Sequence, residues 1–182
     1  MALATGTHTL GPDGASLQVR TYREGVAARV GHDLVLDVTR WDAAVEIAAD
    51  PGSSRVELSA DPRSLEVREG LHGLKPLTDR DRGEIRKNID GKVLRGQPIG
   101  FRSRAVRQDG ARIILDGDLT IAGTTRPITA QLDVDGDGRV SGTIPVTQSE
   151  WGIKPYRGMM GALKVRDEIE LAIAARLPVH GD

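Results

Sequence analysis

Short runs of alternating apolar and polar residues recur along almost the whole chain, and they constrain its fold more than any other feature. The longest run closes the sequence, where Ile169, Leu171, Ile173, Ala175 and Leu177 share one parity. Shorter runs occupy 16–20, 33–38, 45–47, 55–59, 112–121 and 128–134. Successive side chains of a strand point to opposite faces, so each run predicts a strand with one face toward a core.

Glycine-bearing turns separate several of these runs. Asp109-Gly110, residues 123–125 and residues 135–138 each provide the positive φ that a tight hairpin needs. Neighbouring runs are therefore expected to pair antiparallel.

One segment follows a helical period instead. Ile85, Ile89 and Val93 recur every fourth residue, after a Thr78 N-cap with Asp81 three residues further on. We expect one helix over about 78–94, lying across one end of the sheet.

Roughly eight to ten strands with one helix favour a closed barrel, because closure removes edge strands that otherwise aggregate. No linker interrupts the 182 residues. The fold class is therefore expected to be mostly β: a single antiparallel β-barrel domain over 1–182, with one helix across an end.

The composition narrows the possible partners. The chain has 25 Lys and Arg against 26 Asp and Glu, which gives no overall attraction for nucleic acid. It contains no cysteine, so disulfides and thiolate metal sites are excluded. The N-terminus lacks a signal-peptide pattern, and no apolar run is long enough for membrane insertion, so we expect a cytoplasmic protein.

The order of these parts resembles the YceI-like family. The most specific pieces are residues 119–128, which read Leu-Thr-Ile-Ala-Gly-Thr-Thr-Arg-Pro-Ile, and residues 98–103, which contain the only phenylalanine. His32-Asp33-Leu34, Ser64-Leu65 at the end of a strand, and Trp151-Gly152-Ile153 complete the likeness. It implies a lipocalin-like barrel that binds a polyisoprenoid, and a homodimer formed through the exposed faces.

A hollow barrel is the next expectation. Small residues on the inward parity, namely Val19, Ser103, Ala105 and Ala130, leave room inside. The apolar cavity is predicted to be lined by Leu36, Ile47, Phe101, Leu119, Ile121 and Leu132.

The loop 151–160 concentrates large apolar residues. Trp151, Tyr156, Met159 and Met160 form either a lid over the cavity or a plug of ordinary core. Lys154 and Arg157 in this loop, with His32 at the rim, are candidates to contact a polar head group.

Metal and cofactor sites are not expected. The four histidines lack the spacing of a metal site, and residues 133–138 copy the start of a calcium loop but lack its glutamate, with Ile144 in that position. No phosphate-binding loop or nucleophile motif is present, so no catalytic residue is assigned.

We expect a protein that sequesters or transports an apolar, isoprenoid- or lipid-like molecule. One alternative is an enzyme that isomerises or cyclises an apolar substrate, with proton transfer by His32, Tyr156 or Asp167, whose parity points inward. Another is a filled barrel that acts through its surface.

Overall fold

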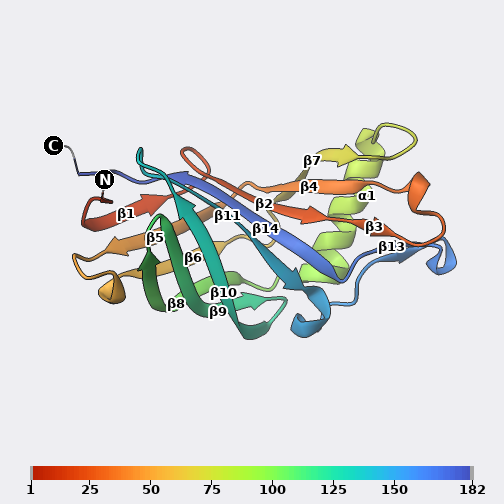
Figure 1. Cartoon of the computed structure of the whole chain (residues 1–182). Coiled ribbons are helices and arrows are strands. Elements are labelled where there is room, and N and C mark those ends of the chain that lie inside the picture. Colours follow the sequence, from red (N-terminus) through yellow and green to blue (C-terminus); the bar gives the residue numbers. More distant parts are fainter. Residues whose placement is uncertain (1, 181–182) are drawn as a thin grey trace.

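The computed structural model describes residues 2–180 and is built around one antiparallel sheet of eleven strands (Figure 1). The strands are β1 (Gly6–Leu10), β2 (Ser16–Thr21), β4 (Asp33–Val38), β5 (Trp41–Ile47), β6 (Arg55–Ala60), β7 (Leu65–Leu71), β8 (Ile99–Asp109), β9 (Arg112–Ile121), β10 (Thr124–Val134), β11 (Arg139–Thr147) and β14 (Glu168–Arg176). Their order in the sheet is β1-β5-β6-β8-β9-β10-β11-β14-β2-β4-β7. The mostly β, antiparallel, barrel-like prediction with one helix is confirmed.

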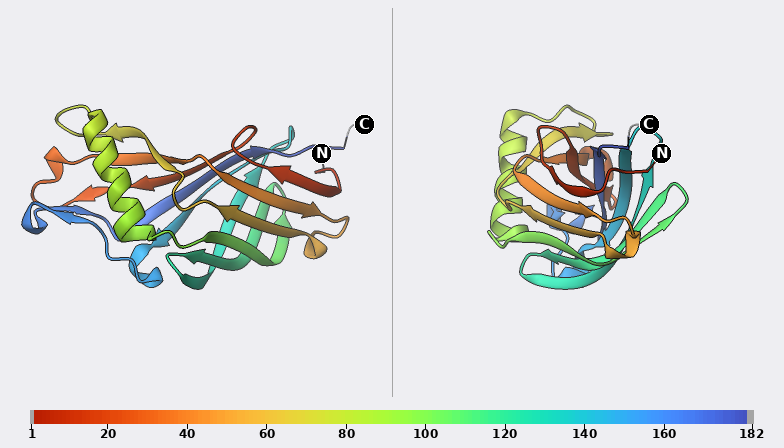
Figure 2. Two further views of the ribbon diagram at one scale, coloured as in Figure 1. Left: turned by 180° about the vertical axis from the view of Figure 1, so that it is seen from behind. Right: turned by 90° about the vertical axis from the view of Figure 1, so that its left-hand side faces the viewer.

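The sheet curls strongly around the long axis of the molecule, as its end-on view shows (Figure 2). Complete hydrogen-bonded closure does not occur within residues 2–180, since β1 and β7 remain its two edges. Two connections instead link the opposite edges of the sheet. The chain passes from β4 to β5 and from β6 to β7, and in each case the two strands lie near opposite ends of the strand order. At their bends, Thr39 N donates to Ser64 O (2.9 Å) and Asp61 N donates to Arg40 O (2.9 Å).

Ser64 lies fully buried at this bend, where its hydroxyl donates to the carbonyl oxygens of Arg40 and Asp61. We predicted that Ser64-Leu65 ends a strand, and this was wrong, because Leu65 begins β7. Both carbonyl oxygens also accept a backbone N–H, from Asp61 N and Ser64 N respectively, so the hydroxyl gains its own partners inside an already bonded turn.

The hairpin turns occur at the glycines, as predicted. Gly110 joins β8 to β9 with φ +58°, and Asp135 Oδ1 accepts from the backbone nitrogens of Asp137 and Arg139 in the β10–β11 turn. Between β9 and β10 the two turn residues are Ala122 and Gly123, both with positive φ, as a type I′ turn requires. Residues 124 and 125, which we assigned to this turn, already belong to β10.

The helix α1 (Asp79–Asn88) continues into a π-helical segment, η3 (Ile89–Leu94). Thr78 Oγ1 accepts from Asp81 N, and Asp81 Oδ2 accepts from Thr78 N, which completes the predicted capping box. The helix lies across one end of the molecule, opposite the two termini (Figure 1). Among residues 2–180, no helix has the length and apolar composition needed to cross a bilayer.

A small second sheet lies at the same end as the helix. It joins β3 (Arg23–Glu24), β13 (Leu163–Val165) and β12 (Arg157–Gly158), with 3-10 turns η1 (Ala28–Val30) and η5 (Met159–Gly161) beside it. Two further 3-10 turns, η2 (Pro51–Ser53) and η4 (Gln148–Trp151), lie elsewhere. We call the end with α1 and the small sheet the helix end, and the other the terminal end.

Candidate functional site

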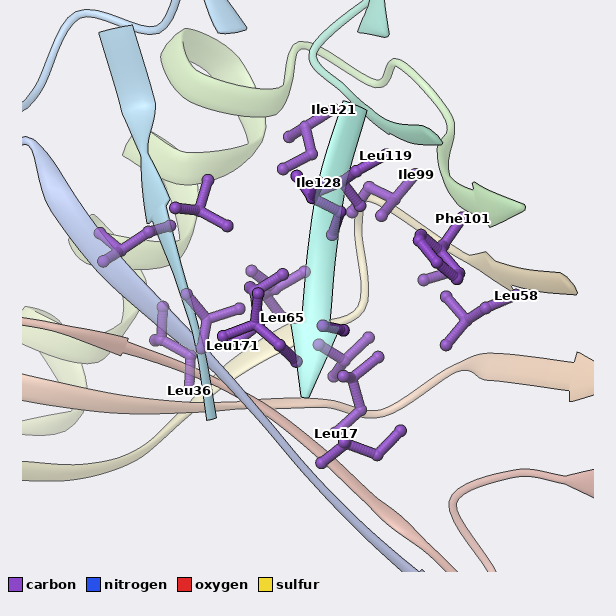
Figure 3. A pocket seen from close by; sticks show the side chains of 18 of the residues that line it. Leu17, Leu36, Leu58, Leu65, Ile99, Phe101, Leu119, Ile121, Ile128 and Leu171 are labelled. Atoms are coloured by element: carbon purple, nitrogen blue, oxygen red, sulfur yellow. The ribbon is translucent and has the colours of Figure 1, made fainter. Parts of the chain in front are cut away.

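A cavity of about 1290 Å³ occupies the interior of the curled sheet and extends from the helix end to the terminal end. Its walls are mainly Leu, Ile, Val and Ala side chains (Figure 3). This volume exceeds the roughly 300–1000 Å³ of ordinary small-molecule pockets. The predicted hollow interior is therefore present, and the filled-barrel alternative loses its physical basis.

The inward parity of the strands builds this wall. Six predicted residues all line it: Leu36, Ile47, Phe101, Leu119, Ile121 and Leu132. Four residues of one parity in β14, together with Leu177 directly after the strand, line it as well: Ile169, Leu171, Ile173 and Ala175. Inward residues such as Leu17 and Val19 have intermediate exposure: they pack against the core cluster and also line the cavity.

Phe101 links the two hydrophobic clusters of the interior. One cluster lies around Leu36, Leu119 and Trp151, and the other around Val106, Leu115 and Ala130. Phe101 packs against both and lies on the cavity wall (Figure 3).

The predicted inward position of Ala105 is wrong. The pairing of β8 with β9 shifts between Ser103 and Ala105, which leaves one extra residue in β8. Beyond this bulge the parity reverses, so Ala105 is exposed and Val106 takes the inward position. Ser103 keeps its side of the sheet, and its hydroxyl accepts from Val56 N (2.8 Å).

Polar side chains gather at the two ends of the cavity. At the terminal end they are Thr5, Glu46, Ser54, Gln108 and His180. At the helix end they are Arg23, His32, Lys75, Asp81, Glu84, Asn88, Lys92, Tyr156 and Lys164. All four Lys and Arg residues of the wall lie at the helix end, so the potential of the cavity is most positive there.

A hydrogen-bonded network fixes the rim of the helix end. His32 Nε2 lies 2.7 Å from Lys75 O, and the predicted rim position of His32 agrees with this contact. Asp33 points away from His32; its carboxylate accepts from Arg23 N (2.8 Å) and lies 2.6 Å from His72 Nδ1. Burial raises the pKa of Asp33, but these hydrogen bonds and the nearby charges outweigh burial and bring it below its usual value.

A second polar pair lies beside this rim. The Tyr22 hydroxyl donates to Glu170 Oε2 (2.7 Å), and the Arg166 guanidinium lies 5.9 Å from the ring centre. The hydrogen bond to Glu170, and then burial, raise the pKa of Tyr22. These contacts attach β2 and the start of β3 to β14 and the loop before it.

The loop 151–160 divides its apolar residues among three environments. Trp151 is buried in the core and its indole donates to Leu119 O (2.9 Å), so it is not part of the cavity wall. Tyr156 lines the cavity at the helix end, while Met159 and Met160 project to the exterior. Trp151 is thus ordinary core, as the plug alternative expects, and only Tyr156 of the four contacts the cavity. Met159 and Met160 form neither a lid nor a plug, which corrects their predicted place at the ligand.

The predicted head-group residues are also divided. His32 lines the cavity, whereas Lys154 and Arg157 are exposed outside its wall. The cationic wall residues Arg23, Lys75, Lys92 and Lys164 were missed, because separate segments bring them together and no local motif marks them.

Asp167 does not point into the cavity, which corrects the parity argument. It lies between β13 and β14, where its carboxylate accepts from Ser149 N (2.8 Å) and Ser149 Oγ (2.5 Å). Because β13 ends at Val165 and β14 begins at Glu168, the inward–outward alternation does not continue through Asp167. Within residues 2–180 there is no group of three or more His, Asp or Glu side chains arranged to hold a metal ion.

The sequence matches the YceI-like domain over residues 13–177. The chain belongs to the YceI-like family. No curated protein gives a significant sequence match. The resemblance noted from the sequence motifs is thereby confirmed.

Solved structures share the YceI-like fold at low sequence identity. BcnA of Burkholderia cenocepacia superposes with a TM-score of 0.66 at 16% identity, covering 88% of this chain and 94% of that one. A polyisoprenoid binding domain from Saccharophagus degradans, implicated in plant cell wall breakdown, gives 0.54 at 10% identity, with 96% and 100% covered. The Campylobacter jejuni YCEI protein gives 0.54 at 12% identity, with 78% and 82% covered.

Proposed function

We propose that this YceI-like protein binds and carries a long apolar molecule of the isoprenoid or lipid type inside its barrel. The cavity of about 1290 Å³ with aliphatic walls is the observation that carries the proposal. Removing apolar surface from water contributes about 25 cal/mol per Å², so a long hydrocarbon gains more from such a cavity than a compact polar molecule. The polyisoprenoid binding domain of similar fold supports the same ligand class.

The distribution of charge sets the orientation of the ligand. At the helix end the wall has four cationic residues and the acidic residues Asp81 and Glu84, whereas at the terminal end its charged residue within 2–180 is Glu46. An anionic or strongly polar head group is therefore best stabilised near Lys75 and Lys164, with the tail directed along β14 and β9 toward the terminal end. Arg23 is partly engaged already, since its guanidinium donates to Leu71 O (3.2 Å).

The test is native mass spectrometry of protein purified from its own host, followed by extraction of the bound lipid. We expect a co-purifying apolar molecule with one polar end. Purified protein whose mass equals that of the bare chain, and which takes up no added prenyl lipid, would overturn the proposal.

A matched pair of variants locates the ligand. Leu132→Trp places an indole into the cavity, whereas Gln131→Trp adds the same side chain on the exposed face of the same strand. Retention of the lipid should fall with Leu132→Trp and stay unchanged with Gln131→Trp. Equal retention by both variants would place the lipid outside the cavity.

The cytoplasmic location and the homodimer stay predictions. Fractionation of the host and light scattering of the purified protein test them directly. The enzymatic alternative retains His32 and Tyr156 at the cavity wall but loses Asp167, and we do not propose it.

A further inference from the structure

The exposed large apolar side chains gather in one region of the surface. Within residues 2–180, the large apolar side chains that are exposed to solvent are Val26, Val30, Leu71, Leu74, Tyr156, Met159 and Met160. All seven belong to three segments at the helix end, 22–32, 71–78 and 154–166, which we call the mouth segments. Soluble proteins rarely leave such groups of apolar side chains together on a surface without a function.

The mouth segments contact one another and form one surface. The backbone of β13 pairs with β3, and Ala27 N donates to Ala162 O (2.9 Å), which joins segments 22–32 and 154–166. His32 Nε2 lies 2.7 Å from Lys75 O, which joins segments 22–32 and 71–78. In Figure 1 the mouth segments lie at the right, with both termini at the other end of the molecule.

The same segments carry an excess of positive charge. They contain seven of the 25 Lys and Arg residues and one of the 26 Asp and Glu residues, which gives a net charge of +6. The whole chain has a net charge of -1, so the remainder of the molecule has a net charge of -7. When the charged residues next to the mouth segments in the sequence are included, namely Asp33, Asp79, Arg80, Asp81 and Asp167, the net charge is still +3. A cationic surface with projecting apolar side chains has the chemistry of an element that binds the interface of an anionic bilayer.

The surface is continuous with the cavity. Val30, Leu74 and Tyr156 are exposed to solvent and also line the cavity wall, together with Lys75 and Lys164 from the same segments. These three side chains therefore connect the exposed apolar surface of the mouth segments with the apolar wall of the cavity. This continuity favours a membrane over a protein partner, since the proposed cargo resides in membranes.

We propose that the mouth segments dock the protein onto an anionic membrane surface, with the cavity open toward the lipid. Val26, Met159 and Met160 enter the interface, and the surrounding Lys and Arg residues contact the anionic head groups. The exchange of cargo rests on the proposed function, whereas the docking itself is measurable without cargo.

The first experiment is flotation of the full chain with vesicles. One set is phosphatidylcholine alone, and the other is equal parts of phosphatidylcholine and phosphatidylglycerol. We expect binding to the anionic vesicles that falls at least about tenfold when the salt rises from about 0.01 M to about 1 M, because the Debye length shortens from about 30 Å to about 3 Å. Equal binding to both sets, or binding to neither, overturns the proposal; absence of binding would make a protein partner the better occupant.

Two variants separate the contributions of charge and apolar contact. Lys154→Glu with Arg157→Glu should lower binding at least about tenfold, given the attraction of each basic side chain to an anionic surface. The control, Arg55→Glu with Arg139→Glu, makes the same change in net charge with exposed residues at the terminal end. Loss of binding in the control to the same extent overturns docking by the mouth segments.

The apolar variant replaces Val26, Met159 and Met160 with Asn, which tolerates the positive φ of the two methionines. We expect weaker vesicle binding with an unchanged thermal midpoint, because all three side chains are exposed. Unchanged vesicle binding would contradict insertion of these side chains.

The two proposals fail separately. Vesicle binding by a protein that retains no lipid would overturn the carrier function and support membrane docking. A lipid found by native mass spectrometry in a protein that ignores anionic vesicles would support the carrier function and overturn docking.

Discussion

The ring of Phe101 in β8 occupies the space over Gly117 in β9 that a larger side chain at position 117 would need. A Cβ built on Gly117 would lie 2.5 Å from Phe101 Cζ and 2.5 Å from Arg102 O. Phe101 packs against both hydrophobic clusters, so this close approach lies where the two clusters meet. The single phenylalanine and the glycine between two apolar runs thus form one packing unit.

We expect Gly117→Ala to destabilise the protein by about 1–3 kcal/mol, as overpacking of a tight site does. The backbone oxygen of Arg102 cannot move independently, so the strain reaches β8 as well as the phenylalanine ring. Urea unfolding followed by circular dichroism measures the effect. A stability equal to that of the wild type would contradict the close packing.

A glycine in open space provides the comparison. A Cβ on Gly83 in α1 would have no atom within 4 Å, and alanine favours a helix by about 1 kcal/mol over glycine. Gly83→Ala should therefore raise the free energy of unfolding in the same assay. Destabilisation by both alanines would show that the effect at Gly117 is not specific to its surroundings.

Alternation predicted the cavity wall well because a strand has a strict period of two. The inward residues of β14 and the six predicted wall residues all lie where the parity places them. The parity failed at Ala105 because of a bulge, and at Asp167 because one strand ends and another begins. The bulge at residues 103–105 of β8 contains no glycine or proline, although Gly117 lies opposite Ser103 where the register shifts, and residues 165–169 contain neither residue type.

The loop 151–160 shows a second limit of sequence reasoning. Trp151, Tyr156 and Met160 are all large and apolar, yet one is core, one is cavity wall and one is exposed. Composition predicts that a segment gathers apolar surface but does not say on which side of the wall each residue lies. The cationic wall residues were missed for a related reason, since only the folded chain brings four separate segments to one end.

Removing the N-cap of α1 should destabilise the helix, and with it the part of the cavity wall that the helix forms at the helix end. Thr78→Ala leaves Asp81 N without its side-chain acceptor, and such a change costs about 1 kcal/mol. Thr78→Ser keeps the hydroxyl and should retain most of that stability. Hydrogen exchange of α1, compared with that of β9, measures the effect; equal protection in both variants would contradict it.

The Asp33 network predicts a loss of stability in acid. Because the pKa of Asp33 is lowered in the folded protein, its contribution is fully present above the unfolded value of about 4 and is lost as the pH falls through the lower folded value. Asp33→Asn should be less stable than the wild type at neutral pH, and the difference should shrink in acid. Thermal midpoints between about pH 7 and about pH 2 test this.

A second variant divides the Asp33 network. His72→Asn suits the positive φ of that position and keeps the hydrogen bond from Arg23 N to Asp33. It should lose only part of the acid-dependent stability that Asp33→Asn loses. Complete loss with His72→Asn would assign the whole effect to the histidine.

The two tryptophans allow the energy of one buried hydrogen bond to be measured. Trp151 Nε1 donates to Leu119 O (2.9 Å), whereas Trp41 Nε1 is buried without a hydrogen-bond partner among residues 2–180. Both side chains are almost fully buried, so replacement by phenylalanine removes similar apolar surface from each. Trp151→Phe also leaves the Leu119 carbonyl without this donor, so it should cost about 0.5–1.5 kcal/mol more than Trp41→Phe in urea unfolding. Equal costs would show that the hydrogen bond adds nothing to the packing of Trp151, and that η4 is attached to β9 by apolar contact alone.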